Sequence, residues 1–494
     1  MVSLDQLLQD VSYSHIQGNM NIVVTGVTSD SRRVRKNFAY VAVHGVRFDG
    51  ETFINDALVR GANLIVSEKD EKILDACTVL KVPNARFALA QLSCNFYDNP
   101  SRKLQMVGIT GTNGKTTVAH LIEHIMHEPD NHVGMMGTIE YRFADYYYRA
   151  QMTTPDAPFL NYLLSKMVQE KIKTAVMEVS SHALQQERTA GIDFDVAVFT
   201  NLTSDHLDYH KNLDDYLSAK TRLFSQLSES EHKNRAAVIN ADDPASSYIL
   251  KHTKGRAVTY AITAPGDITA SDIRLTSDGT SFIATIFGQP VNIQIPLLGI
   301  HNVYNTLAAI GAAYTLGADF DQLRDKLYTF KGVPGRLNKI EVARNFSVYV
   351  DYAHTDDALK QVILTIKKVH EGRVIVLFGC GGDRDRTKRP LMGTTVCKYA
   401  DYAIITSDNP RSENPLAIIE DIKKGFWKDN YCIEHDRKSA IKLGLDLCKK
   451  GDVLLVAGKG HEKYQIIGDV LYPFDDEQII KEYLRGTESC AQAR

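Results

Sequence analysis

The stretch Val107-Gly-Ile-Thr-Gly-Thr-Asn-Gly-Lys-Thr-Thr117 decides how this chain folds. An apolar run, 104–109, leads into it, and apolar residues at helical spacing follow it as far as Met126. This pattern predicts a strand, a glycine loop and a helix in that order. Glycines let a backbone fold around a phosphate chain with its N–H groups pointing inward, and the helix N-terminus adds positive potential. The stretch therefore predicts a nucleoside triphosphate site.

Two side chains at the end of this loop suit that ligand. Lys115 can place a positive charge at the β- and γ-phosphates, and Thr116 can offer a hydroxyl to Mg²⁺. The glycine spacing differs from the standard P-loop, whose first glycine would fall at Ile109. The loop residues expected around the nucleotide are Gly111, Thr112, Asn113, Gly114, Lys115, Thr116 and Thr117.

Length and composition narrow the class of protein. A chain of 494 residues has room for three domains of about 150 residues each. The formal net charge of −3 gives no reason to expect nucleic-acid binding, and no apolar run approaches the roughly 20 residues that span a bilayer. Seven cysteines without a C-x-x-C pair, and an N-terminus without a secretory signal, predict a cytoplasmic protein with reduced thiols.

The order of apolar and turn segments predicts an α/β protein of three domains. Residues 1–98 form a small N-terminal α/β domain, and residues 99–335 a central P-loop-type domain. In the central domain strands alternate with helices, which favours a mostly parallel sheet, and the segments on either side of 288–290 predict an antiparallel section. Residues 336–494 form a C-terminal Rossmann-like α/β domain. The main strands are expected at 106–109, 174–177, 196–199, 236–239, 347–350, 374–378, 402–406 and 453–457.

Several polar residues follow predicted strands, where α/β proteins place their ligands. Glu178 comes directly after a strand and suits nucleotide-bound Mg²⁺, although a solvated loop carboxylate is the alternative. His206 and His210 are four residues apart, but the glutamate of H-E-x-x-H and a third ligand are missing, so zinc is disfavoured. A Mg²⁺ ligand or phosphate contact at Asp205 or His206 is favoured instead. Residue type alone makes Lys220 an ordinary exposed helix lysine.

Segments along the whole chain resemble the Mur ligases, the ATP-dependent amide-forming enzymes of peptidoglycan precursor synthesis. They are 111–117, 177–182, 200–210, 218–220, 299–302 and 351–354. The shifted glycine spacing is that of the family's loop. The resemblance is strongest to the ligases that add the third peptide residue, and it implies a role in cell-wall synthesis, cell shape and cell division.

The resemblance implies a two-step reaction. The D-Glu carboxylate of UDP-MurNAc-L-Ala-D-Glu attacks the γ-phosphate of ATP to give an acyl phosphate, and the amine of the next amino acid displaces phosphate. Two Mg²⁺ ions are implied. One is expected near Thr116 and Glu178, and the other near His206, where Lys220 is carbamylated by CO₂. The family thus assigns Lys115, Glu178, His206 and Lys220 to catalysis.

Further contacts are carried over from the family. Those implied for ATP are Asn302, Arg336, Asp351 and His354, and those for the UDP-MurNAc dipeptide are Ser31, Thr153, Thr154, Ser180, Gln186 and Arg188. The family usually has proline where Asp356 stands, and its loss is expected to loosen that turn.

The segment Ser407-Asp-Asn-Pro-Arg-Ser412 bears on which amino acid is added. Asp-Asn-Pro-Arg resembles the signature of ligases for meso-diaminopimelate, whose second carboxylate a guanidinium can bind bidentately. Arg411 would repel the ammonium of L-lysine, and Arg411→Ala is expected to weaken diaminopimelate use. Glu462 can pair with the distal ammonium. The implied amino-acid contacts are Arg389, Asp408, Asn409, Pro410, Arg411, Gly458 and Glu462.

Three alternatives remain beside a monomeric diaminopimelate ligase. The same scaffold could add L-lysine. A folylpolyglutamate synthetase shares the glycine loop and fold, but is not expected to carry 408–411 or the run 177–184 in this form. A non-catalytic scaffold of cell-wall assembly is disfavoured, because Lys115, Glu178, His206 and Lys220 occur together. Closure of the domains around substrates is also expected.

Overall fold

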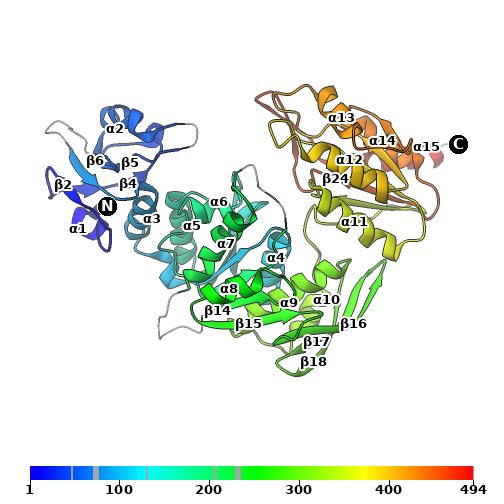
Figure 1. Cartoon of the computed structure of the whole chain (residues 1–494), viewed down its shortest axis with the longest axis horizontal. Helices are drawn as coiled ribbons and strands as arrows, with labels where there is room; N and C mark the ends of the chain where they lie inside the picture. Colours follow the sequence, from blue (N-terminus) through cyan, green and yellow to red (C-terminus); the bar gives the residue numbers. More distant parts are fainter. Residues whose placement is uncertain are drawn as a thin grey trace. The chain divides into compact units, whose positions relative to one another are not determined.

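The computed structural model describes residues 1–45, 48–69, 77–128, 132–203, 205, 209–227 and 235–492, with side chains to residue 485 (Figure 1). The chain divides into two compact units. The first contains Met1–Thr269 and Asn305–Phe320, and the second contains Ala270–Tyr304 and Asp321–Arg494. Both units are α/β, as predicted, whereas domain boundaries at 98 and 335 stay predictions.

The first unit opens with a small sheet in the order β2-β7-β6-β5-β4. Strands β4 to β7 are parallel, and β2 pairs antiparallel with β7. Its strands are β2 (His15–Gln17), β4 (Gly26–Thr28), β5 (Phe38–Val41), β6 (Ala62–Ser67) and β7 (Thr78–Lys81), and a separate pair is β1 (Val2–Ser3) with β3 (Val23–Val24). The helices here are α1 (Leu4–Leu7), α2 (Ile54–Val59) and α3 (Ala85–Phe96).

A larger sheet follows in the same unit, in the order β11-β10-β9-β12-β8-β13-β14-β15, and the next strand, β16, belongs mostly to the second unit. Strands β9, β12, β8, β13, β14 and β15 are parallel, as the alternation of strands and helices predicted. The strands are β8 (Gln105–Thr110), β9 (Val133–Met136), β10 (Glu140–Phe143), β11 (Tyr146–Arg149), β12 (Thr174–Glu178), β13 (Val196–Phe199), β14 (Ala236–Asn240), β15 (Arg256–Ala261) and β16 (Ile268–Thr276). The helices are α4 (Lys115–Met126), α5 (Ala157–Gln169), α6 (Ser181–Gln185), α7 (Leu213–Ser225), α8 (Ser246–His252) and α9 (Ile300–Thr315), of which α9 belongs to this unit from Asn305 onward.

The central strands of this sheet are buried on both faces, which explains their nearly continuous apolar sequences. Ala237 and Ile239 of β14 share one core with α5, α7 and α8. Val238, between them, faces Gly311 of α9 on the other side, as alternation along a strand requires. The sheet is therefore the middle layer, and its carboxyl-end loops are free to carry polar residues.

The second unit contains the antiparallel pair β17 (Gly279–Ile286) and β18 (Gln289–Ile295), which confirms the predicted antiparallel section. Its main sheet has the order β19-β20-β24-β21-β22-β23, parallel except for the edge strand β19. The strands are β19 (Asn338–Ile340), β20 (Ser347–Asp351), β21 (Val374–Phe378), β22 (Tyr402–Ile405), β23 (Tyr431–Ile433) and β24 (Val453–Ala457), and a small hairpin joins β25 (Tyr464–Ile467) to β26 (Val470–Pro473).

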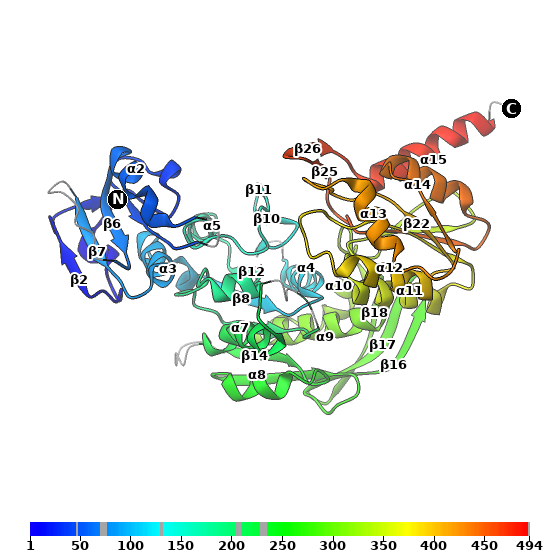
Figure 2. The ribbon, with the colours of Figure 1, turned by 45° about the horizontal axis from the view of Figure 1, so that its top comes forward.

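Helices cover both faces of this parallel sheet (Figure 2). Helices α11, α12 and α13 pack on one face, and α14 and α15 on the other. Their bounds, with that of α10, are α10 (Leu323–Tyr328), α11 (Asp356–Val369), α12 (Lys388–Tyr399), α13 (Pro415–Lys423), α14 (Arg437–Leu447) and α15 (Asp476–Gln492). This doubly wound arrangement is the predicted Rossmann-like pattern. In the part of the chain that is described, no helix is both long and apolar enough to cross a membrane.

Candidate active site

Parallel register gathers the first set of site residues. Glu178 at the end of β12 lies opposite Ile109 of β8, and Phe199 of β13 lies opposite Thr110. The loops that leave these three strands therefore emerge side by side at one edge of the sheet. The glycine loop leaves β8 at this edge and leads into α4, as predicted.

Two glycines give this loop its shape. Gly111 has φ +147° and Gly114, which precedes α4, has φ +89°. A Cβ at Gly111 would collide with Thr200 Oγ1, and a Cβ at Gly114 with Asn305 Oδ1. Both positions therefore require glycine for conformation as well as for space.

Hydrogen bonds make the loop rigid. Asn113 N donates to Asn201 Oδ1 at 2.9 Å, and Asn113 O accepts from Thr200 Oγ1 at 2.7 Å. Thr112 Oγ1 accepts from Thr203 N at 3.0 Å. Lys115 Nζ donates to the carbonyls of Gly111 and Thr112 at 2.9 and 2.8 Å. Lys115 thus holds its charge at the mouth of the loop, while Thr117 is buried in the first turn of α4.

Thr116 and Glu178 meet at this edge, as predicted. Thr116 Oγ1 donates to Glu178 Oε2 at 3.1 Å, and Glu178 is 1% exposed. Sequence reasoning missed Thr138, which donates its N–H to Glu178 Oε1 at 2.8 Å and its hydroxyl to Oε2 at 3.0 Å. Thr138 follows β9, the neighbour of β12, so the same strand-end rule could have found it. A hydroxyl and a carboxylate are oxygen donors that suit Mg²⁺.

Lys220 is deeply buried in α7, so the interpretation as an exposed helix lysine is wrong. Its exposed fraction is 1%, its Nζ donates to Gly111 O at 2.8 Å, and it lies 4.2 Å from the Tyr216 ring centroid. Burial, and then the charge of Lys115, hold the pKa of the Lys220 ammonium well below its ordinary value, although Asp205 opposes this. The structure thus brings Lys220 to the glycine loop.

The two histidines have different outcomes. His206 lies outside the described residues, so its predicted role stays a prediction. His210 is buried, with Nε2 2.9 Å from Ser181 Oγ and Nδ1 3.5 Å from Asp215 Oδ2. These contacts link His210 to the start of α6 and to α7 inside the first unit.

Most residues predicted for the UDP-MurNAc dipeptide form one group beside Glu178. Thr154 Oγ1 donates to Glu178 O at 2.9 Å and accepts from Ser180 N at 3.0 Å. Arg188 donates to Thr154 O at 2.9 Å and to Gln186 Oε1 at 3.1 and 2.7 Å.

Two members of that predicted set have other surroundings. Thr153 Oγ1 is 3.2 Å from Thr138 Oγ1, which places it next to the Glu178 carboxylate. Ser31 begins a 3₁₀ turn after β4 in the small sheet, capped by Asp30. The structure thus groups five of the six residues and leaves Ser31 in another part of the same unit.

In the second unit, three residues predicted for ATP surround Tyr352. The Arg336 guanidinium lies 4.8 Å from the Tyr352 ring centroid, and His354 Nδ1 is 2.8 Å from Tyr352 O. Asp351 accepts from Ala353 N at 2.7 Å. Burial raises the pKa of the Asp351 carboxyl, and the positive charge of Arg336 opposes that rise.

The fourth residue predicted for ATP, Asn302, is on α9 and donates to Leu298 O at 2.8 Å. The loosening expected near Asp356 stays a prediction. Helix α11 begins at Asp356, and Thr355 caps it by accepting from Ala358 N at 3.2 Å. An aspartate at the start of a helix also interacts favourably with the helix dipole, so proline is not needed there.

Four residues predicted to bind the amino acid form a connected set in the second unit. Asn409 Nδ2 donates to Glu462 Oε2 at 2.8 Å, and Asp408 Oδ1 accepts from Asn409 N at 2.7 Å. Gly458 has φ +107° and passes so close to Asp408 that a Cβ would lie 2.7 Å from its Oδ2. Sequence reasoning missed Lys459, which is buried and donates to Asn409 Oδ1 at 3.0 Å and Glu462 Oε2 at 3.2 Å.

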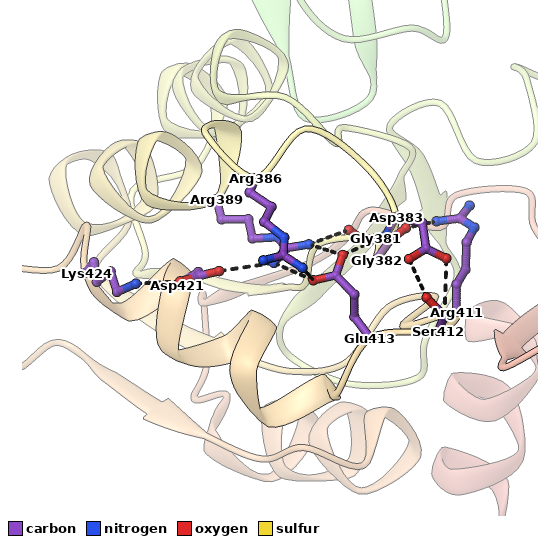
Figure 3. A network of polar contacts seen from close by, with 10 residues as sticks. All are labelled: Gly381, Gly382, Asp383, Arg386, Arg389, Arg411, Ser412, Glu413, Asp421 and Lys424. Carbon is purple, nitrogen blue, oxygen red and sulfur yellow. Dashed lines mark hydrogen bonds and ion pairs between the residues drawn. The ribbon is translucent and has the colours of Figure 1, made fainter. Parts of the chain in front are cut away.

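Arg411 and Arg389 are held in different ways (Figure 3). Arg411 follows Pro410, has φ +51°, and donates from Nη1 to Gly382 O at 2.7 Å. Arg389 is 1% exposed and its guanidinium pairs with Glu413 at 2.8 Å and Asp421 at 3.1 Å. A substrate contact by Arg389 would have to share the guanidinium with these ion pairs.

Comparisons with known proteins agree with this architecture. The model of the Mur ligase middle domain matches residues 109–313, that of the Mur ligase glutamate ligase domain 335–460, and that of the Mur ligase family catalytic domain 23–97. A UDP-N-acetylmuramoyl-L-alanyl-D-glutamate--2,6-diaminopimelate ligase of Caldanaerobacter subterraneus subsp. tengcongensis is 42% identical, and the match covers 98% of this chain and 99% of that protein. The ligase of the same name from Bacillus cereus is 44% identical over 94% of this chain and 95% of its own.

Solved structures give the same result. A structure of a UDP-N-acetylmuramoyl-L-alanyl-D-glutamate--2,6-diaminopimelate ligase has 32% identity and a TM-score of 0.71, with 99% of both chains covered. Mycobacterium tuberculosis folylpolyglutamate synthase has 16% identity and a TM-score of 0.62, with 76% of this chain and 92% of that chain covered, which shows a shared fold alone. By its sequence, its domain models and its near full-length relatives, this chain belongs to the Mur ligase family.

Proposed function

We propose that this chain is an ATP-dependent ligase that joins meso-diaminopimelate to the D-Glu carboxylate of UDP-MurNAc-L-Ala-D-Glu. The observation that carries the proposal is the position of Arg411. It lies on the same loop as Asn409, and Asn409 donates a hydrogen bond to the carboxylate of Glu462. A guanidinium for the second carboxylate and a carboxylate for the distal ammonium match the far end of meso-diaminopimelate. The relatives at 42% and 44% identity bear the name of this activity.

The first step is phosphoryl transfer to the dipeptide. A D-Glu carboxylate oxygen bonds to the γ-phosphorus of ATP, the bond to the β–γ bridging oxygen breaks, and ADP leaves. The glycine loop, Lys115 and the N-terminus of α4 hold the phosphates and offset their charge. Arg188 and its partners Thr154 and Gln186 are suited to orient the dipeptide beside Glu178.

The second step forms the amide. The amine nitrogen of the amino acid attacks the acyl carbon, the carbon–oxygen bond to phosphate breaks, and inorganic phosphate and one proton leave. Asn409, Arg411 and Glu462 would fix the amino acid so that only one of its two amines reaches the acyl carbon. Asp351, His354 and Arg336 remain proposed contacts for ATP, and Asn302 for its adenine.

Mg²⁺ fits the first unit. Thr116 and the Glu178 carboxylate would hold one ion, and the ion would offset charge on the phosphates during transfer. Among the described residues, no cluster of three or more His, Cys, Asp or Glu could hold a metal.

Carbamylation of Lys220 is proposed for the second ion. A neutral amine is needed to attack CO₂, and the lowered pKa of Lys220 provides it. The nitrogen of the neutral amine bonds to the carbon of CO₂ and loses a proton, which gives a negatively charged, carboxylate-like oxygen donor close to Lys115. His206 is proposed to assist it. Because ATP and nucleotide-linked sugars are made in the cytoplasm, the reaction is proposed to take place there.

The test is phosphate release with ATP, Mg²⁺ and UDP-MurNAc-L-Ala-D-Glu, with meso-diaminopimelate compared to L-lysine. We expect kcat/KM for meso-diaminopimelate to exceed that for L-lysine by about a hundredfold or more, because lysine leaves Arg411 facing an ammonium. Preference for L-lysine would keep the ligase chemistry but overturn the assigned amino acid. Release with neither would overturn the proposed function.

A further inference from the structure

The specificity loop, defined here as Asp408–Ser412, is clamped from two sides. On one side Arg411 N donates to Ile466 O at 3.1 Å and Gly468 N donates to Arg411 O at 2.8 Å, which ties the backbone to the hairpin of β25 and β26. On the other side lies the loop after β21, here called the glycine pair loop (Gly379–Asp383). Gly382 N donates to Asn409 O at 2.9 Å.

Two residues that are not glycine adopt left-handed backbone conformations where these loops meet. Asp383 has φ +53° and Arg411 has φ +51°. Such conformations favour glycine and, among other residues, asparagine and aspartate, so surrounding contacts must hold Arg411 in its conformation. Ser412 donates to the Asp383 carboxylate through Oγ at 2.6 Å and through N at 3.3 Å, while Arg411 Nη1 donates back to Gly382 O at 2.7 Å. Hydrogen bonds in both directions thus join the two loops next to Asp383 and Arg411 (Figure 3).

Glu413 anchors this pair to helix α12. Its Oε1 accepts from Asp383 N at 2.7 Å and from Arg389 Nη2 at 2.8 Å, and its Oε2 accepts from Arg389 Nη1 at 3.1 Å. Arg386 also lies 2.9 Å from Oε2. Because Arg389 is buried and also pairs with Asp421, the carboxylate of Glu413 has a fixed position.

We propose that Asp383 and Glu413 are positioning residues for amino-acid specificity, which hold Arg411 in its left-handed conformation with its guanidinium against Gly381 and Gly382. This rests on the proposed function, because Arg411 is assigned to the second carboxylate of meso-diaminopimelate. Neither acid needs to touch the substrate. The glycines leave room for the guanidinium, since a Cβ at Gly381 would lie 3.0 Å from Arg411 Nη1.

The test uses the full-length chain and Glu413→Gln, which keeps an oxygen for Asp383 N but removes the charge that Arg389 and Arg386 bind. We expect KM for meso-diaminopimelate to rise about tenfold or more, with KM for ATP changed less than about twofold, because a displaced guanidinium weakens one contact only. Glu420→Gln is the matched control, since Glu420 is on the nearby helix α13, its side chain is 60% exposed, and it only approaches Lys423 at 3.4 Å.

A double-mutant cycle with Arg411→Asn separates positioning from general damage. If Glu413 acts through Arg411, Glu413→Gln should change KM for meso-diaminopimelate less than about twofold in the Arg411→Asn background. Equal effects in both backgrounds would overturn the proposal. If Glu413→Gln folds poorly, Ser412→Ala removes only the exposed hydroxyl bonded to Asp383, and we expect a rise of about threefold in the same KM.

The outcomes also separate this inference from the proposed function. A wild-type protein that does not use meso-diaminopimelate would overturn the proposed function itself. A wild-type protein that uses it, together with unchanged KM values in Glu413→Gln and Ser412→Ala, would overturn only the positioning role.

Discussion

Burial changes the chemistry that is expected of the Lys220 side chain. Its ammonium is buried beside Gly111 O, with the charge of Lys115 close enough to lower its pKa further. Burial makes the charged form of this lysine costly, and the proposed carbamate would supply oxygen donors in its place.

Lys220→Ala is therefore expected to lower kcat by about a hundredfold or more, because loss of a metal-holding group at a phosphoryl-transfer site is severe. Formate or acetate should restore part of the rate by occupying the place of the carbamate. Lys251→Ala, at an exposed position of α8, should leave the rate unchanged. A Lys220→Ala protein with wild-type phosphate release would contradict the proposed carbamate.

A substitution that tests Arg411 has to tolerate the left-handed backbone conformation at this position. At φ +51° an alanine would add strain of its own, whereas asparagine tolerates this region. We expect Arg411→Asn to lower kcat/KM for meso-diaminopimelate by about tenfold to a hundredfold, as loss of a charge-assisted contact does. The control is Arg485→Ala, at an exposed site of α15. The measurement is steady-state phosphate release at varied concentration of the amino acid. If the ratio of kcat/KM for meso-diaminopimelate to kcat/KM for L-lysine is unchanged, Arg411 does not determine specificity.

The unit of strand, loop and helix that contains Gly111 and Gly114 depends on the absence of a Cβ at both positions. Gly114→Ala should raise KM for ATP about tenfold, because alanine is strained at φ +89° and would press on Asn305. Gly288→Ala is a matched control, since Gly288 has φ +85° and no atom lies within 4 Å of its Cβ position. If both variants have similar KM values for ATP, strain and crowding at Gly114 do not affect binding of the phosphates.

For the whole molecule, pH dependence of stability should come from the second unit. Burial lowers the pKa of His301 to about 4, and burial with the charges of Arg336 and Lys459 lowers that of His461 to about 3. Below the ordinary histidine value of 6.5 the unfolded chain takes up protons that the folded chain does not. Protons therefore favour unfolding, and stability falls as the pH drops below that value.

We expect the melting temperature of the second unit to fall by a few degrees between about pH 7.5 and pH 5.5 in scanning calorimetry. His301→Gln should reduce this fall. His435→Gln, whose side chain is 69% exposed in the wild type, should not. A melting temperature that rises toward pH 5.5 would contradict the assignment.

Local pattern was enough for much of this molecule. The apolar runs that became β8, β12, β21 and β24, the glycine loop before α4, and the strand-end position of Glu178 could all be predicted, because strand burial and turn chemistry depend on neighbours in sequence. The family resemblance added Lys220 and Arg411, whose residue types alone indicate nothing unusual.

Only the tertiary structure decided which hydrogen bonds form between segments that are distant in sequence. Thr138 joins Glu178 through the pairing of β9 with β12, Lys459 supports Asn409 across 50 residues, and Glu413 holds Asp383 while pairing with Arg389. Hydrogen bonds of this kind depend on register and packing in three dimensions, which periodicity within one segment does not encode. For the same reason, the sequence motif could identify Arg389 but could not predict its buried ion pairs.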